Sequence, residues 1–225
     1  MSRIGIFGGT FDPVHLGHLG PALQALAAFA FDELVFVPAG DPPHKQGEPL
    51  TSFAHRFAML ALATAGYERL FVSDIERQRP GPTYTIDTLR LLRERHPAER
   101  LYFLMGSDSF AQITTWHRWE ELVELADLVV LHRLTAWGDE LAAGAPERLR
   151  SRMATVAPGA GARVGESAGA RVHLLDHEPY PVSSTQLRGM VRQGRPVAEL
   201  LPAEVYRYIV KYHLYHDSGE PTDGC

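Results

Sequence analysis

The chain has 225 residues, of which 45% are hydrophobic and 22% charged, and its formal net charge is −5. That length can bury one substantial core, and the composition is ordinary for a globular protein. The negative balance disfavours nucleic acid as a partner, so a phosphate-rich ligand would have to be captured by local positive groups.

Two further features bear on where the protein acts. The only cysteine, Cys225, leaves no internal disulfide possible and favours a cytoplasmic location. The apolar-rich run 19–31 is not a signal-peptide core, because Asp12, His15 and His18 precede it and two acidic residues follow it. No stretch is long enough to span a membrane, so we expect no membrane partner.

The first predicted strand, Ile4–Phe7, leads into the loop Gly8-Gly9-Thr10-Phe11-Asp12-Pro13-Val14-His15-Leu16-Gly17-His18. Two glycines at the end of a strand let the backbone approach a bulky anion closely, since no Cβ obstructs it. Asp12-Pro13 then predicts a helix start, with the acid as N-cap and the proline at the first helical position.

His15 and His18 are three residues apart and share one face of that helix near its N-terminus. Free N–H groups and the positive end of the helix dipole favour phosphate there. The combination predicts a nucleotide phosphate site. The alternatives are an ordinary turn with partly buried histidines, or a metal site. The metal alternative has no third ligand nearby, and a zinc-protease helix would need histidines four apart with a Glu.

Strands and helices are predicted to alternate along the chain, which favours a Rossmann-like, doubly wound parallel sheet of the α/β class with a small C-terminal helical portion. Ligands bind such sheets at the carboxyl ends of the strands, near the switch in strand order. The predicted strands are Ile4–Phe7, Leu34–Val37, Leu70–Val72, Leu101–Met105, Leu128–Leu131 and Val172–Leu175. The predicted helices are Leu16–Ala30, Phe53–Ala65, Thr85–Glu94 and Trp119–Leu125.

Unusual residues do gather after these strands. A rigid, proline-rich loop after the second strand ends in the cation Lys45, and Gly106-Ser107-Asp108 follows the fourth. After the last strand, Ser183 and Gln186 have capping-box spacing, which predicts a helix start with free N–H groups. Arg188 lies one turn further on, so this helix end is a second predicted anion site.

The stretch at about 136–170 is rich in Ala, Gly and Arg, and we expect a surface excursion in which 141–156 holds a short helix. Its part from about 156 to 169 is expected to be dispensable for chemistry, the alternative being a lid or a subunit contact. Residues 1–213 are predicted to form a single domain, and 214–225 a frayed tail.

The loop from Gly8 to His18 resembles the nucleotidyltransferase family with the His-x-Gly-His motif, and within it the bacterial nicotinate-nucleotide adenylyltransferases. Segment 83–89 resembles their Ser-Tyr-Thr-x-Asp-Thr-Leu segment, with Thr83 in place of Ser, and 114–122 resembles their Trp-x-x-Trp segment. The resemblance implies transfer of the adenylyl group of ATP to nicotinate mononucleotide, which gives deamido-NAD and pyrophosphate. The substrate phosphate attacks in line, so positioning and charge stabilisation suffice without a general base.

The resemblance also implies roles for particular residues. His18 would contact the α-phosphate and His15 the neighbouring phosphates, and Lys45 and Arg188 complete the implied catalytic set. ATP would be bound by Gly8, Gly9, Thr10, Phe11, His18, Gly106, Asp108, Ser183, Ser184 and Arg188. Nicotinate mononucleotide would be bound by Lys45, Tyr84, Thr85, Trp116 and His117, with the pyridinium ring stacked on Trp116. Mg²⁺ would be carried by the ATP phosphates, with no metal site on the protein.

Several alternatives stay open at this point. Lys45 could be an ordinary solvated lysine, and Trp116 a core residue, although Trp119 is the better candidate for the core because it begins an apolar stripe. A pantetheine-phosphate adenylyltransferase shares the first motif but should lack the Trp116 segment and be shorter. A nucleotide-binding sensor without turnover should have lost His18 or Arg188.

Overall fold

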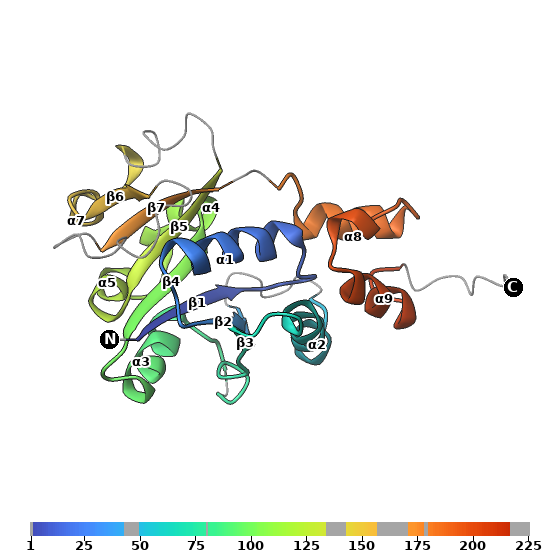
Figure 1. Cartoon of the computed structure of the whole chain (residues 1–225), viewed down its shortest axis with the longest axis horizontal. Helices are drawn as coiled ribbons and strands as arrows, with labels where there is room; N and C mark the ends of the chain where they lie inside the picture. The colour runs from blue at the N-terminus through green and yellow to red at the C-terminus, as the bar shows by residue number, and fades with distance from the viewer. Residues whose placement is uncertain are drawn as a thin grey trace, which may run out of the picture.

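In the computed structural model, which describes residues 2–42, 50–79, 81–133, 143–156, 171–177 and 180–216, one parallel sheet runs through the molecule (Figure 1). Its strand order is β3-β2-β1-β4-β5-β7-β6, so the order reverses between β1 and β4. The strands are β1 (Arg3–Gly9), β2 (Glu33–Pro38), β3 (Leu70–Val72), β4 (Arg100–Gly106), β5 (Asp127–Arg133), β6 (Met153–Val156) and β7 (Val172–His177). The predicted Rossmann-like α/β class is confirmed.

Helices cover both faces of this sheet. The side chains of α1, α2, α8 and α9 belong to one apolar cluster, and those of α3, α5 and α7 to a second one. Figure 1 shows α1 lying along the near face, with α8 and α9 at the same end of the molecule. The helices are α1 (Leu16–Ala28), α2 (Phe53–Thr64), α3 (Thr85–Arg95), α4 (Ser107–Ala111), α5 (Leu122–Leu125), α7 (Glu147–Arg150), α8 (Ser184–Arg192) and α9 (Ala203–Lys211).

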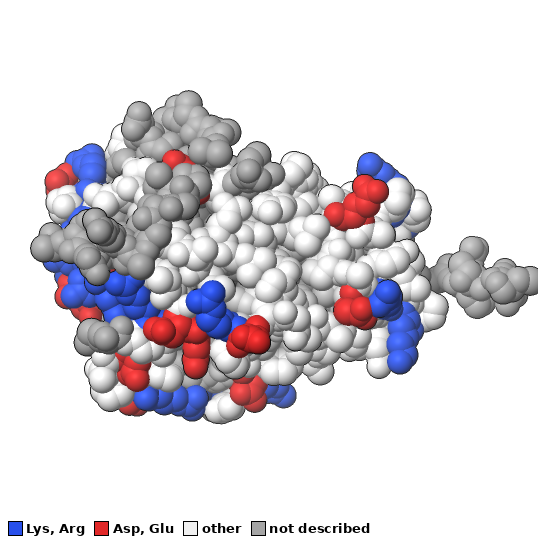
Figure 2. Space-filling view, in the orientation of Figure 1, with Lys and Arg blue, Asp and Glu red and all other residues white. Residues whose placement is uncertain are grey.

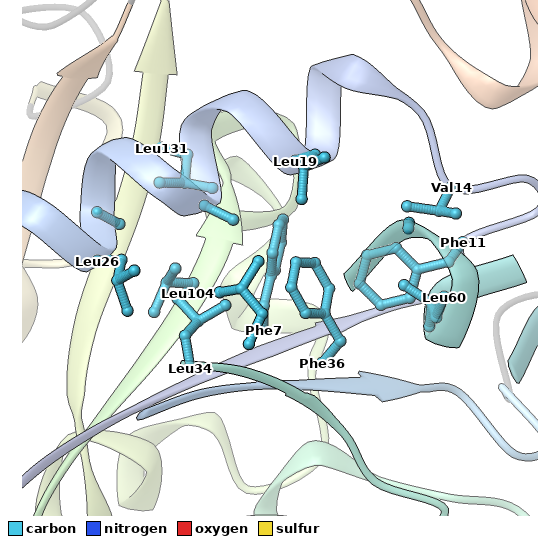
Figure 3. Close-up of a cluster of buried hydrophobic side chains, with 14 of the residues drawn as sticks. Phe7, Phe11, Val14, Leu19, Leu26, Leu34, Phe36, Leu60, Leu104 and Leu131 are labelled. Carbon is cyan, nitrogen blue, oxygen red and sulfur yellow. The ribbon is translucent and has the colours of Figure 1, made fainter. Parts of the chain in front are cut away.

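The two clusters follow from the alternation of side chains along each strand. Phe7 and Leu104 point to the α1 face, whereas Ile6 and Phe103 point to the opposite face. Because both faces are covered, the strands are apolar runs with few polar interruptions. Figure 3 shows the first cluster, in which strand side chains meet Leu19 and Leu26 of α1.

Each predicted strand and helix is present, with ends shifted by a few residues. One predicted helix, Trp119–Leu125, is not a single α-helix. It divides into a 3-10 turn, Trp119–Glu121, and the short helix α5. The helices α8 and α9 make up the predicted C-terminal helical portion.

The short helix expected within 141–156 is present, but a strand that the sequence analysis did not predict follows it. Met153–Val156 is the edge strand β6, parallel to β7, and the helix α7 before it spans only Glu147–Arg150. Leu149 is fully buried and Val156 nearly so, which anchors this part of the expected excursion in the core. A short apolar run of this kind becomes a strand because β7 offers it an open edge, a contact that local sequence does not show. Residues 157–170 lie outside the described residues.

The predicted boundary at 213 also needs correction. Leu214 and Tyr215 are half-buried and pack against the first apolar cluster, so the ordered chain continues to these two residues. Residues 217–225, with Cys225, lie outside the described part.

Within the described residues, no helix is long and apolar enough to cross a membrane. Figure 2 shows that charged side chains on the described part of the near face are scattered, blue beside red, and that its centre over α1 is uncharged. No continuous basic surface of the kind that binds nucleic acid is visible among the described residues of that face.

Candidate active site

A cavity of about 250 Å³ lies at the carboxyl end of β1, beside the point where the strand order reverses. The sequence analysis predicted a ligand site at this position of the sheet. The cavity is lined by Phe7, Gly8, Gly9, Thr10, Phe11, Asp12, His18, Ser109, Ser184, Thr185 and Arg188. The first predicted anion site and the second one, on α8, therefore meet around a single cavity.

The loop between β1 and α1 differs from its prediction at the helix start. α1 begins at Leu16 with His15 as the N-cap residue, so Asp12 is not the cap and Pro13 is not the first helical residue. The Asp12–Pro13 peptide bond is cis, and Phe11 has a φ of 52°. The carboxylate of Asp12 is engaged elsewhere, since it accepts hydrogen bonds from the backbone N–H of Thr51 and the hydroxyl of Tyr215.

His15 and His18 face each other at the start of α1, with ring centroids 3.8 Å apart. The backbone N–H of His15 donates to Nδ1 of His18 at 3.3 Å. Because a backbone N–H can only donate, Nδ1 is the acceptor, and the neutral His18 ring then carries its proton on Nε2. Burial, and secondly the nearby His15, lower the pKa of His18 well below its ordinary value. His18 thus offers the cavity a neutral N–H donor.

Ser183, Ser184 and Arg188 lie at the start of α8, as predicted. Ser183 caps the helix and forms a capping box with Gln186. The hydroxyl of Ser184 donates to the carbonyl oxygen of Pro13 at 2.9 Å, and Nη1 of Arg188 donates to that of Asp12 at 2.8 Å. These bonds fix the amino end of α8, and its positive dipole, against the β1–α1 loop.

The glycines of the loop are needed for packing as well as for access. A Cβ on Gly8 would come within 3.0 Å of the Phe103 ring, and one on Gly9 within 3.0 Å of the Phe11 ring. Phe11 is almost fully buried, with its ring 5.1 Å from that of His18. It anchors the loop in the core and forms part of the cavity wall, so only part of its surface is available to a ligand.

The residues after β4 are placed differently from one another. Gly106 is the N-cap of α4 and Asp108 lies in its first turn, and both are exposed. Neither lines the cavity, whereas the following Ser109 does. The predicted contacts of Gly106 and Asp108 with ATP stay predictions.

A second group of predicted residues lies at the start of α3. Tyr84 is the N-cap of this helix and Thr85 its first residue, and the ring of Tyr84 lies 4.6 Å from that of His117. Trp116 is half-buried, edge-on to Phe103 at 6.3 Å. Trp119 is also only half-buried, so both tryptophans pack at the margin of the second cluster and Trp119 is not the fully buried one expected.

Lys45 lies outside the described residues. The loop that leads to it is held by Glu76, whose Oε2 accepts from the backbone N–H of Gly40 at 3.1 Å. The other carboxylate oxygen accepts from the Thr88 hydroxyl of α3 at 2.8 Å. Glu76 therefore ties the end of β2 to the helix that carries Tyr84 and Thr85.

Sequence reasoning missed Arg56, which is 1% exposed. Its guanidinium donates to the carbonyl oxygens of Thr10, Ala39 and Thr51, at 2.8, 2.8 and 2.9 Å. A signal for it was present, because Arg56 stands at helical spacing from the buried Met59, Leu60 and Ala63 of α2. A cation on the buried stripe of a helix needs partners, and here they are loop carbonyls.

The other missed residues left no such signal. Thr51 and Tyr215 reach Asp12 through contacts that span 39 and 203 positions of sequence. Ser109 and Thr185 line the cavity as neighbours of predicted residues. Among the described residues, no cluster of three or more His, Cys, Asp or Glu side chains could hold a metal ion.

Known proteins resemble this chain over most of its length. The cytidylyltransferase-like family profile matches residues 6–190. A protein of Pseudomonas aeruginosa named a probable nicotinate-nucleotide adenylyltransferase is 42% identical over 95% of this chain and 97% of its own length. One of the same name from Geobacter sulfurreducens is 38% identical, over 96% and 100%.

Among solved structures, the nicotinic acid mononucleotide adenylyltransferase of Plasmodium falciparum complexed with NaAD has a TM-score of 0.71. It covers 96% of this chain and 98% of its own, at 21% identity, and so supports the fold. The family profile and the full-length relatives go further: the chain belongs to the cytidylyltransferase-like superfamily and, within it, to the nicotinate-nucleotide adenylyltransferase family.

Proposed function

We propose that this protein transfers the adenylyl group of ATP to nicotinate mononucleotide, in NAD biosynthesis. An oxygen of the mononucleotide phosphate bonds to the α-phosphorus of ATP, and the bond from that phosphorus to the β-bridging oxygen breaks. The products are deamido-NAD and pyrophosphate. The observation that carries the proposal is the meeting of the Gly8-Gly9 turn, His18 and the start of α8 around one cavity.

The triphosphate is assigned to the cavity on the strength of its donors. Backbone N–H groups of a glycine turn, the amino end of α8 and the guanidinium of Arg188 all favour an anion. We assign His18 to the α-phosphate and His15 to the neighbouring phosphates. Ser183, Ser184 and Arg188 are assigned to the β- and γ-phosphates. The backbone N–H of His15 also supports His18, because its hydrogen bond to Nδ1 leaves the Nε2–H for the phosphate.

Direct transfer is favoured over a covalent intermediate. The one carboxylate among the described residues that line the cavity is that of Asp12, and both of its oxygens accept hydrogen bonds from the protein. A carboxylate held in this way is poorly placed to attack phosphorus or to take a proton. The attacking phosphate is already an anion, so positioning and charge stabilisation supply the rate.

The acceptor is assigned to the start of α3 and the turn that carries Trp116. The pair Tyr84–His117 and the half-buried Trp116 offer flat surfaces to a pyridinium ring, and the free N–H groups at Thr85 suit its carboxylate. Lys45 is assigned to the same substrate from its motif position. Gly106 and Asp108 remain assigned to the adenosine ribose.

A divalent metal accompanies ATP in nucleotidyltransferases generally, and we take it to be Mg²⁺ carried by the phosphates and water. We place the reaction in the cytoplasm, which the single cysteine of the chain supports.

The mechanism is tested with ATP that is chiral at the α-phosphorus, with nicotinate mononucleotide as the acceptor. Direct in-line attack predicts a dinucleotide with inverted configuration at that phosphorus. Retention of configuration, or an adenylylated protein trapped in the absence of the acceptor, would contradict it. Mass spectrometry of the product in the same reaction identifies the dinucleotide.

A further inference from the structure

Asp12 presents an electrostatic difficulty at the candidate site. Its side chain is 2% exposed, and it belongs to the wall of the cavity to which we assign an anionic triphosphate. A carboxylate near phosphate groups repels them, and in a poorly solvated wall that repulsion is only weakly screened. The protein must therefore control where this charge is directed.

Two hydrogen bonds from distant segments hold the carboxylate. The backbone N–H of Thr51 donates to Oδ2 at 3.1 Å, and the hydroxyl of Tyr215 donates to Oδ1 at 2.6 Å. Burial, and secondly the charge of Asp12, raise the pKa of Tyr215 above its ordinary value. Tyr215 is therefore a protonated donor at any pH at which the enzyme works.

Arg188 lies next to the same residue. Its Nη1 donates to the backbone carbonyl oxygen of Asp12 at 2.8 Å, so the guanidinium contacts the same residue that carries the carboxylate. If Oδ1 lost its bond from Tyr215, this cation would be a strong donor beside it, whereas the other nearby cation, Arg56, already donates to three carbonyl oxygens. An ion pair between Asp12 and Arg188 would then compete with the phosphates for the guanidinium.

We propose that Tyr215 is a positioning residue for nucleotide binding. Its hydroxyl holds the Asp12 carboxylate away from Arg188, and thereby keeps that cation available to the phosphates of ATP. The inference rests on the proposed function only in taking the ligand to be ATP.

The turn that carries Tyr215 is built to hold it in place. After α9 the chain bends back, with the N–H of Leu214 donating to the carbonyl of Ile209 at 3.0 Å. His213 and Tyr215 have φ values of 49° and 68°, in the left-handed region that residues other than glycine rarely adopt. Leu214 and Tyr215 both pack against the first apolar cluster, and this packing holds the turn in that conformation.

The test compares Tyr215→Phe with Tyr206→Phe, which removes the same hydroxyl from an exposed position on α9. The dissociation constant of ATP is measured by calorimetry without the acceptor. We expect Tyr215→Phe to weaken ATP binding about tenfold. That is the effect of losing one charge-assisted hydrogen bond between Arg188 and a phosphate of ATP. The Tyr206→Phe variant should bind ATP like the wild type. Equal affinity in all three proteins would overturn the inference.

Two further measurements distinguish the proposed role of the Tyr215 hydroxyl from a role in stabilising the fold alone. In an Asp12→Asn background the side chain carries no charge to pair with Arg188, so adding Tyr215→Phe should change ATP affinity by less than about threefold. Binding of adenosine, which has no phosphate, should be unchanged by Tyr215→Phe alone. The same loss of affinity in both backgrounds, or an equal loss for adenosine, would show that the hydroxyl only stabilises the fold.

These results do not depend on the acceptor. Wild-type protein that binds ATP but forms no dinucleotide with nicotinate mononucleotide would refute the proposed function while leaving the comparison of Tyr215 variants decisive. Dinucleotide formation at the wild-type rate, with unchanged ATP affinity in Tyr215→Phe, would refute the inference alone.

Discussion

The backbone N–H of His15 donates to Nδ1 of His18, and this bond fixes which nitrogen of His18 carries the proton. The neutral ring then keeps its Nε2–H for a ligand in the cavity. A histidine with a lowered pKa that stays a hydrogen-bond donor suits a phosphate whose charge redistributes as the reaction proceeds.

His18→Ala should therefore reduce turnover more than it weakens ATP binding. Donors aimed at developing charge are typically worth about 10²–10³ in rate, whereas a ground-state hydrogen bond to phosphate adds less to affinity. The measurement compares kcat with the dissociation constant of ATP for wild type and variant. Turnover at the wild-type level would remove His18 from the mechanism.

The lowered pKa of His18 also makes a prediction about stability. Below the ordinary value of 6.5 the unfolded chain binds a proton at this residue while the folded protein does not. Stability contributed by His18 is thus complete above that pH and is lost as pH falls toward the folded pKa, by at most about 1.4 kcal/mol per pH unit.

The test is denaturant unfolding at pH 7.5 and 5.5. His18→Asn should lose less stability than the wild type over that interval, whereas the same change at the exposed His216 should leave the wild-type difference intact. A pH dependence that is identical in wild type and His18→Asn would contradict the assignment.

Arg56 should be a major source of stability for the loops around the cavity. Arg56→Met keeps the apolar stem but leaves the carbonyls of Thr10, Ala39 and Thr51 without their donor, and we expect a loss of at least about 3 kcal/mol. Arg56→Lys should restore little, because a single ammonium cannot reproduce the three-way fork.

The matched control for that experiment is Arg207→Met on α9, where the side chain is 69% exposed. Its free energy of unfolding should stay within about 0.5 kcal/mol of the wild type. Similar losses for Arg56→Met and Arg207→Met would mean that the three carbonyl bonds contribute nothing specific.

The geometry of β6 and β7 constrains the segment that joins them. Val156 pairs with Leu175 and Met153 with Val172, so the chain leaves β6 at one end of the pair and enters β7 at the other. A parallel pair needs a crossover of a dozen or more residues. Residues 157–169 are therefore expected to tolerate replacement by other residues without loss of activity, but the length of the connection has to be kept.

Replacing residues 157–169 with a Gly-Ser segment of equal length should leave kcat/KM within about twofold of the wild type, since a flexible linker of that length still closes the crossover. A four-residue link should release β6, which hydrogen exchange at the β6–β7 amides would detect. A large fall in kcat/KM, or a changed solution mass, with the full-length replacement would show a role for the segment itself.

Elements with a strong local pattern could be predicted from the sequence. The apolar runs of β1, β2 and β4 and the capping box at Ser183 identify themselves within a few residues, because period and capping chemistry are local. The meeting of both anion sites at one cavity followed from the rule that parallel strands present their ligands at one edge.

Three of the differences between prediction and structure involve partners far away in sequence. Asp12-Pro13 has the local pattern of a helix start, but the acid is bound to Thr51 and Tyr215, so the helix begins later, at Leu16. Met153–Val156 has no strong pattern of its own and becomes a strand because β7 has a free edge. Tyr215, in the tail predicted to be frayed, is ordered because the core and Asp12 hold it.

The most direct measurement is acceptor-dependent release of pyrophosphate from ATP, as kcat/KM for nicotinate mononucleotide, nicotinamide mononucleotide and pantetheine phosphate. We predict release of pyrophosphate with nicotinate mononucleotide and none with pantetheine phosphate. With nicotinamide mononucleotide, release should be at least about tenfold less efficient, because the amide leaves N–H donors at Thr85 poorly paired. Equal efficiency with acid and amide would show that those donors do not select the carboxylate. Release with pantetheine phosphate alone, or with no acceptor, would contradict the proposed function.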